Sequence, residues 1–138
     1  LAGYCVVTYL LGVGDRHLDN ILLTHGGYLF HIDFGYIYGE EPPMKGTISP
    51  KIRIIKQMID VMGGYQSQKY QTFQKYIRSS YGRLRKMAPL ILNLLSLIGQ
   101  GSMQKIEENI RFVYTRFSLE INEDLAANEL LRIVEEAA

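Results

Sequence analysis

The order of apolar and polar positions in the first third of the chain predicts one helix followed by a β-hairpin. Residues 2–11 are almost entirely apolar and are followed by Gly12, which predicts a helix that stops there. Two short strand-like runs, 21–24 and 28–32, flank the glycine pair 26–27. Because two glycines readily adopt the positive φ angles of a two-residue turn, these runs predict an antiparallel hairpin.

The second half of the chain has helical periodicity almost throughout. Its apolar spacing predicts helices at 52–62, 67–87, 89–98 and 104–117, and a last helix that begins after Asn122 and runs to about residue 136. The helix at 67–87 has one apolar face, formed by Tyr70, Phe73, Ile77, Tyr81 and Leu84. The segment 89–98 is so apolar that we expect it to be buried. We therefore expect a mostly α fold with a small β-hairpin.

Residues 35–50 lack clear periodicity. They hold three of the four prolines and three glycines, residues that interrupt regular structure. We expect a long loop here, and long loops inside compact domains are usually functional or mobile.

Composition limits the class of protein. A chain of 138 residues with 47% apolar residues is long enough for one domain with a hydrophobic core. The single cysteine, Cys5, excludes an intrachain disulfide, and with only three histidines a Cys/His zinc cluster is not expected. Cys5 lies among apolar residues, so we expect a buried, inert thiol in a reducing compartment.

The net charge of +1 is unevenly distributed along the chain. Residues 51–86 carry nine basic side chains and one acidic side chain, a net charge of +8, whereas residues 103–138 carry eight acidic and four basic side chains, a net charge of −4. The basic segment either faces an anionic membrane or a phosphorylated ligand, or is a solvated helix face that the acidic segment balances in three dimensions.

The stretch GDRHLDN, residues 14–20, places four titratable side chains and one amide between two apolar runs. One interpretation is a polar surface turn whose Asp and Asn side chains cap backbone groups. The other interpretation is an active-site loop, and the register of the hairpin bears on the choice.

A two-residue turn would pair His25 with Tyr28 and, counting outwards, Asn20 with Asp33. Directly opposed residues on antiparallel strands have Cβ atoms ~5 Å apart on one face. An amide oxygen and a carboxylate at that separation suit Mg²⁺, which proteins usually hold with one or two carboxylates and the phosphates of a substrate. The alternative is an Asn that closes the hairpin beside a solvated Asp.

Two short motifs resemble those of kinases. Asp33-Phe34-Gly35 is the DFG triplet whose Asp holds Mg²⁺ in protein kinases, and Asp15 precedes Asn20 by five residues, the spacing of the kinase catalytic loop. The order here is Asp-Arg-His instead of His-Arg-Asp. With this inversion, GVGDRHLDNILL and FHIDFGYI closely resemble the phosphatidylinositol 3- and 4-kinase superfamily. The stretches LAGYCVVTYLLGVGDRHLDN, MGGYQSQKYQTF and LILNLLSL are most similar to the class III phosphatidylinositol 3-kinases.

The resemblance extends from residue 1 to about residue 136 and implies the C-terminal lobe of a protein-kinase-like α+β catalytic domain. It implies a catalytic loop at 14–20, the DFG motif at 33–35 and an activation loop at 36–51. The sequence contains no glycine-rich phosphate loop, strand lysine or αC-type glutamate. We therefore expect an N-terminal lobe as a partner, and we expect these 138 residues alone to be inactive.

The resemblance also implies roles for individual residues. Asn20 and Asp33 would bind Mg²⁺ that bridges the phosphates of ATP. His17 is the candidate general base for the inositol 3-hydroxyl, because a neutral imidazole can accept a proton. Asp15 either orients His17 or is itself the base. Arg16 either contacts phosphate or forms a structural ion pair.

The implied activation loop indicates which lipid is phosphorylated. It contains Glu40 and Glu41, and acidic residues there would repel the additional phosphates of a bisphosphorylated lipid. The cations Lys45, Lys51 and Arg53 suffice for a singly charged headgroup, although ordinary surface cations would look the same. We therefore expect transfer of the ATP γ-phosphoryl group to the 3-hydroxyl of phosphatidylinositol.

Two alternatives belong to other classes of protein. A phosphatidylinositol-kinase-like Ser/Thr protein kinase shares the Asp-Arg-His and DFG motifs, and a scaffold without turnover would keep the fold alone. For the lipid kinase, the resemblance implies a membrane containing phosphatidylinositol, a pseudokinase-like regulatory subunit and no nucleic-acid partner. It also implies a cytoplasmic protein that is peripheral on endosomal or autophagic membranes.

Overall fold

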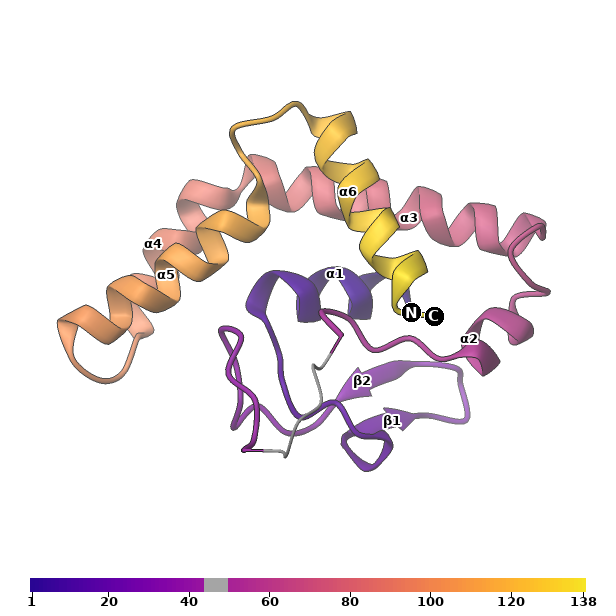
Figure 1. The fold of residues 1–138 in the computed structure, drawn as a ribbon, viewed down its shortest axis with the longest axis horizontal. Helices are drawn as coiled ribbons and strands as arrows, with labels where there is room; N and C mark the ends of the chain where they lie inside the picture. Colours follow the sequence, from indigo (N-terminus) through magenta and orange to yellow (C-terminus); the bar gives the residue numbers. More distant parts are fainter. Residues whose placement is uncertain (44–49) are drawn as a thin grey trace.

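The computed structural model describes residues 1–43 and 50–138. Their elements are, in chain order, α1 (Ala2–Leu11), η1 (Leu18–Asn20), β1 (Ile21–Leu23), β2 (Leu29–His31), α2 (Lys56–Val61), α3 (Gln68–Lys86), α4 (Ala88–Ile98), α5 (Met103–Phe117) and α6 (Glu123–Glu136). In Figure 1, α3 and α6 lie above α1, the hairpin β1–β2 lies below it, and α4 and α5 extend together to one side. The predicted mostly α fold with a small β-hairpin is confirmed.

Helix α1 lies at the centre of the core. It packs against α3, α5 and β2, and its buried residues are Tyr4, Cys5, Val6, Thr8, Tyr9 and Leu10. A helix that is apolar on almost all sides is stable only when it is surrounded in this way. Cys5 is fully buried as predicted, and burial raises the pKa of its thiol to about 12.

The ends of the helices follow the capping signals of the sequence. Gly12 ends α1 in the left-handed conformation with φ 57°, and its N–H donates to the carbonyl oxygens of Thr8 and Tyr9. The side chains of Ser67 and Asn122 accept hydrogen bonds from the backbone N–H groups three residues later and so cap α3 and α6. The apolar face predicted for α3 is also confirmed, since Tyr70, Phe73, Ile77 and Tyr81 are buried and Leu84 is partly buried.

Helix α2 is shorter than predicted. The predicted helix at 52–62 begins only at Lys56, because the preceding residues are extended. Ile52 and Ile54 are both buried, and this two-residue spacing is typical of an extended segment and not of a helix. The segment therefore leads the chain into the core before the helix starts.

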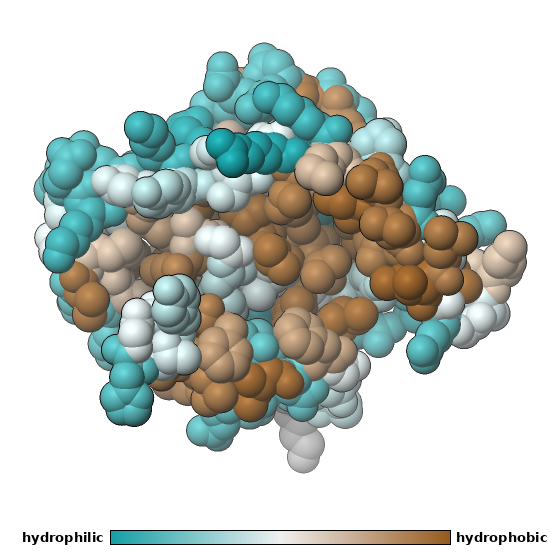
Figure 2. Space-filling model, turned by 180° about the vertical axis from the view of Figure 1, so that it is seen from behind, coloured by the Kyte–Doolittle hydropathy of each residue, from teal (hydrophilic) through white to brown (hydrophobic). Residues whose placement is uncertain are grey.

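The prediction that residues 89–98 form a buried helix is wrong. Helix α4 forms, but its only fully buried residue is Ala88. The outer face is between 51% and 80% exposed and consists of Leu90, Leu94, Leu97 and Ile98. Helix α4 packs on α5 and on the end of α3, and within the described residues no element covers its other side. Figure 2, the view from behind, shows apolar side chains gathered over this end of the molecule.

The basic segment and the acidic segment meet where α3 packs on α6. The Nζ atom of Lys86 lies 3.5 Å from Oε2 of Glu123, and Arg78 donates a hydrogen bond to Asn128. Arg85 donates to the backbone oxygens of Phe117, Ser118 and Ile121 at 2.7 to 2.8 Å. Part of the basic segment thus forms ion pairs and hydrogen bonds with the rest of the chain. For these residues the contacts support a structural role in place of binding to a membrane or a phosphorylated ligand.

Among the described residues, no helix combines the length and the apolar character that are needed to cross a membrane.

Candidate active site

The hairpin has a register one residue away from the predicted one. Ile21 pairs with His31 and Leu23 pairs with Leu29. The turn has three residues instead of two: the N–H of Thr24 donates to the oxygen of Tyr28 at 2.9 Å, and Gly27 has φ 83°. A three-residue hairpin commonly ends in such a left-handed glycine. The predicted pairing of Asn20 with Asp33 is therefore wrong.

Asn20 is instead joined to the residue before Asp33. The N–H of Ile32 donates to the backbone oxygen of Asn20 at 3.1 Å, so the antiparallel pairing continues to the start of the DFG motif. The side chain of Asn20 is buried, with 8% of the residue exposed. The two segments that carry the predicted metal ligands are thus fixed to each other by the backbone, without a direct pairing of the ligands themselves.

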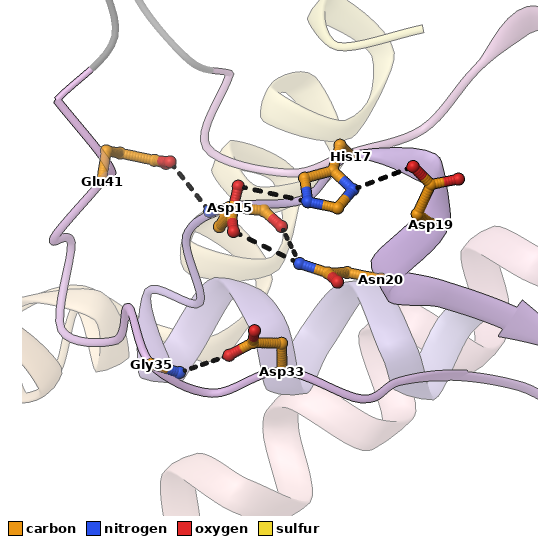
Figure 3. A network of polar contacts seen from close by, with 7 residues as sticks. All are labelled: Asp15, His17, Asp19, Asn20, Asp33, Gly35 and Glu41. Carbon is orange, nitrogen blue, oxygen red and sulfur yellow. Dashed lines mark hydrogen bonds and ion pairs between the residues drawn. The ribbon is translucent and has the colours of Figure 1, made fainter.

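The amide of Asn20 is oriented by Asp15. Its Nδ2 atom donates to the backbone oxygen of Asp15 at 2.9 Å and to Oδ2 of the same residue at 3.3 Å. Because the nitrogen and oxygen of an amide point to opposite sides, the Asn20 oxygen is turned away from Asp15 (Figure 3). Asp15 has φ 48°, a left-handed conformation that Asp and Asn tolerate better than most residues.

Asp33 is held in a local turn. Its Oδ1 atom accepts a hydrogen bond from the N–H of Gly35 at 2.8 Å, the usual pattern of an Asx-turn. In Figure 3, the Asp33 carboxylate and the Asn20 amide oxygen both lie below Asp15 and His17. One carboxylate oxygen of Asp33 is left without a hydrogen-bond partner among the described residues.

The donor set of Asn20 and Asp33 fits Mg²⁺. Carboxylate and amide oxygens are hard ligands, and Mg²⁺ is usually held by one or two carboxylates together with substrate phosphates and water. Within residues 1–43 and 50–138, no group of three or more His, Cys, Asp or Glu side chains is placed to hold a metal ion.

His17 lies between two carboxylates and is accessible to a substrate. Its side chain is 52% exposed, its Nε2 atom lies 3.6 Å from Oδ1 of Asp15, and its Nδ1 atom lies 3.9 Å from Oδ2 of Asp19. Both distances exceed those of hydrogen bonds, so neither carboxylate is hydrogen-bonded to the imidazole. Asp15 thus contacts both Asn20 and His17.

Arg16 forms a structural ion pair with Glu41 of the predicted activation loop. Its Nη2 atom lies 2.6 Å from Oε1 of Glu41, and only 7% of the Arg16 side chain is exposed. The other oxygen of Glu41 accepts the N–H of Asp15 at 3.0 Å. The neighbouring Glu40 pairs with Lys105 of α5. Both acids are therefore paired with cations. Because their charges are neutralised, they do not supply the free negative charge that was expected to repel additional lipid phosphates.

The sequence matches the family model described as phosphatidylinositol 3- and 4-kinase over residues 1–105. The chain belongs to this family. It is 44% identical over 140 aligned residues to phosphatidylinositol 3-kinase pik3 of Schizosaccharomyces pombe, covering 99% of this chain and 17% of the relative. It is 41% identical over 140 residues to phosphatidylinositol 3-kinase VPS34 of Saccharomyces cerevisiae, covering 99% and 16%. The chain thus spans about a sixth of the length of these relatives.

Family membership and the observed architecture agree with the predicted C-terminal lobe of a kinase-like fold. Of the three cations predicted to bind substrate, the structure describes Lys51 and Arg53. Lys45 lies outside the described residues, and Lys51 is exposed at the end of the activation loop. Arg53 is half-buried, and its Nε atom is buried without a hydrogen-bond partner among the described residues.

The sequence reasoning missed that the first part of the activation loop is fixed to α1. The N–H groups of Tyr38 and Gly39 donate to the backbone oxygens of Leu11 and Gly12 at 2.7 and 2.9 Å. The ring of Phe112 packs so closely on both glycines that a Cβ atom would lie 2.3 Å from it at Gly12 and 2.5 Å from it at Gly39. The positive φ angles of these glycines, 57° and 82°, are the local reason for their residue type.

Proposed function

We propose that this chain is the C-terminal lobe of a lipid kinase catalytic domain, which in the full-length protein transfers the γ-phosphoryl group of ATP to the 3-hydroxyl of phosphatidylinositol. One short loop presents the exposed imidazole of His17 and the oriented amide of Asn20, and its backbone is hydrogen-bonded to the residue before Asp33. This arrangement carries the proposal. The relatives that match 99% of the chain and are named phosphatidylinositol 3-kinases support it.

Asn20 and Asp33 are the proposed Mg²⁺ ligands. The amide oxygen of Asn20 is available because both amide hydrogens are directed at Asp15. Asp33 contributes the carboxylate oxygen that does not accept the Gly35 N–H. When bound, Mg²⁺ neutralises the charge that develops on the phosphates of ATP during transfer.

His17 is the proposed general base. The Asp15 carboxylate is the nearer of the two, 3.6 Å from Nε2 compared with 3.9 Å between Asp19 and Nδ1, so in this proposal Nε2 carries the hydrogen and Nδ1 accepts the proton of the inositol 3-hydroxyl. General-base catalysis of this kind typically accelerates a reaction by ~10²–10⁴-fold. In this assignment Asp15 is a positioning residue and not the base.

The proposed substrate contacts are cations in and beside the predicted activation loop, and the proposed cellular setting follows the family resemblance. Lys51 is an exposed cation at the end of the activation loop and is the proposed contact of a singly charged headgroup, with Lys45 and Arg53 as further candidates. The family resemblance supports an N-terminal lobe as the second half of the ATP site and a pseudokinase-like regulatory subunit. It also supports a cytoplasmic location on endosomal or autophagic membranes.

The test is the choice of substrate by the full-length protein. With Mg²⁺ and ATP, we expect a 3-phosphorylated product from vesicles of plain phosphatidylinositol and none from vesicles of its 4,5-bisphosphate. A product from the bisphosphate would refute the proposed lipid specificity. Phosphorylated casein with no lipid product would refute the lipid kinase and favour the Ser/Thr protein kinase, which shares the same motifs.

A further inference from the structure

A pocket of about 270 Å³ lies where α1, the catalytic loop, the activation loop and α5 meet. Its lining includes Gly12, Arg16, Gly39, Glu41, Lys51 and Arg116. His17, Asn20 and Asp33 do not line it, so it lies beside the proposed base and metal ligands, and it shares Lys51 with the proposed headgroup contact. Its volume is just below the ~300–1,000 Å³ of pockets that bind drug-sized ligands, so it suits a compact group.

Arg116 supplies the first sign of a ligand. Its guanidinium carbon lies 4.7 Å from the ring centroids of both Tyr9 and Phe112, so the group is held in place by two aromatic rings. Its Nη1 atom is buried and has no hydrogen-bond partner among the described residues. A buried guanidinium N–H without an acceptor is costly, and an orphaned donor of this kind needs an explanation.

The charges around the pocket supply the second sign. Arg16, Lys51 and Arg116 contribute three positive charges, whereas Glu41 contributes one negative charge. Glu41 already accepts from Arg16 at 2.6 Å and from the N–H of Asp15 at 3.0 Å. The pocket therefore has an excess of two positive charges, and guanidinium groups are the side chains best suited to phosphate oxygens.

We propose that this pocket binds a phosphomonoester group through the guanidinium of Arg116, with Arg16 beside it and Lys51 at the rim. A phosphomonoester carries a charge of about −1.5 to −2 at neutral pH, which matches the excess positive charge. The bound group would connect α5 to the catalytic loop and to the end of the activation loop. Its source is either free phosphate or the headgroup of a phosphorylated inositol lipid.

Calorimetric titration of the full-length protein tests the site, without nucleotide and without Mg²⁺, using inorganic phosphate and inositol 1,3-bisphosphate as probes. The Arg116→Gln variant should weaken binding at least tenfold. The Glu41→Gln variant should tighten binding about threefold or more, because it removes the competing carboxylate. The matched control is Arg132→Gln, since Arg132 is an exposed arginine of α6 that pairs with Glu136, and it should leave binding unchanged.

Lys51→Gln keeps the proposal testable if Arg116→Gln does not fold, because Lys51 is exposed and its loss does not disturb the core. This variant should weaken binding about threefold or more. Bisphosphate binding that is at least tenfold tighter than phosphate binding would identify the lipid headgroup as the source, and equal binding would identify free phosphate. The proposal is overturned if the wild type binds neither probe, or if the Arg116, Lys51 and Arg132 variants bind alike.

Discussion

The side-chain amide of Asn20 directs both of its hydrogens at Asp15, to the backbone oxygen at 2.9 Å and to Oδ2 at 3.3 Å. The second carboxylate oxygen of Asp15 lies 3.6 Å from Nε2 of His17. One acidic side chain therefore orients the proposed metal ligand and lies beside the proposed base. This relationship supports the proposal that Asp15 is a positioning residue and His17 the base, a choice that the sequence left open.

If Asp15 positions Asn20, its removal should act mainly through Mg²⁺. Asp15→Ala should raise the Mg²⁺ concentration that gives half-maximal lipid kinase activity by about 10–100-fold, because losing a group that orients a metal ligand usually lowers the metal affinity by this factor. Asp15→Asn should restore most of the Mg²⁺ affinity, because Asn tolerates the left-handed φ of 48° and offers an acceptor to Asn20. An Asp15→Asn variant whose rate falls by ~10²-fold or more at an unchanged Mg²⁺ half-saturation would instead identify Asp15 as the base.

The ion pair between Arg16 and Glu41 should stabilise the fold. Glu41→Ala leaves a guanidinium that is only 7% exposed without its partner, and it removes the acceptor of the Asp15 N–H. We expect the free energy of unfolding to fall by about 1–3 kcal/mol, measured by urea unfolding with circular dichroism. The matched control is Glu40→Ala, whose partner Lys105 is exposed, and it should have a much smaller effect. Equal effects of the two substitutions would contradict this role of Glu41.

In the three-residue turn of the hairpin, only one of the two glycines has a backbone conformation that favours glycine. Gly27 has φ 83° and open space around it, so Gly27→Ala should cost about 1–2 kcal/mol of stability through backbone strain alone. Gly26 lacks a positive φ, and a Cβ atom there would make only ordinary contacts, the nearest at 3.4 Å. Gly26→Ala should therefore be nearly neutral in the same unfolding measurement. The two-residue turn expected from the sequence would require positive φ at both positions, and equal losses would support it.

Alkaline pH should destabilise the fold. Burial raises the pKa of Cys5 from 9.0 to about 12 and those of Tyr4 and Tyr81 from 10.0 to about 12. Above pH 9 the unfolded chain loses these protons before the folded chain does, so the contribution of these groups to the free energy of unfolding is constant below pH 9 and falls between pH 9 and 12. Urea unfolding at pH 7, 9 and 10.5 measures this loss. A constant stability over that range would show that these groups ionise equally in both states.

The sequence correctly predicted features that depend only on residues close together in the chain. Asn122 caps its helix as expected, and the 3- and 4-residue spacing of Tyr70, Phe73 and Ile77 correctly identified the buried face of α3. The GDRHLDN stretch correctly marked a loop next to the DFG motif, because the hairpin between them is a local structure.

The features that were missed depend on distant parts of the chain or on one added residue. The hairpin register changed because Thr24 and Tyr28 close a three-residue turn, and glycine content alone does not distinguish this turn from a two-residue one. The acids at 40 and 41 were expected to be free, but their partners are Lys105 and Arg16, 65 and 25 residues away. Helix α4 has an apolar composition, which does not reveal whether another element covers its outer face.

The central claim is that Asp33 and Asn20 hold the metal of a lipid phosphotransfer site. The most direct test is the rate of 3-phosphorylation of plain phosphatidylinositol by the full-length protein and by its Asp33→Ala variant, at saturating ATP over a range of Mg²⁺ concentrations. The claim predicts a loss of at least ~10²-fold in the variant, with unchanged thermal stability, because the charge of the transferred group is no longer neutralised. A variant that keeps its rate within about threefold at every Mg²⁺ concentration would contradict it.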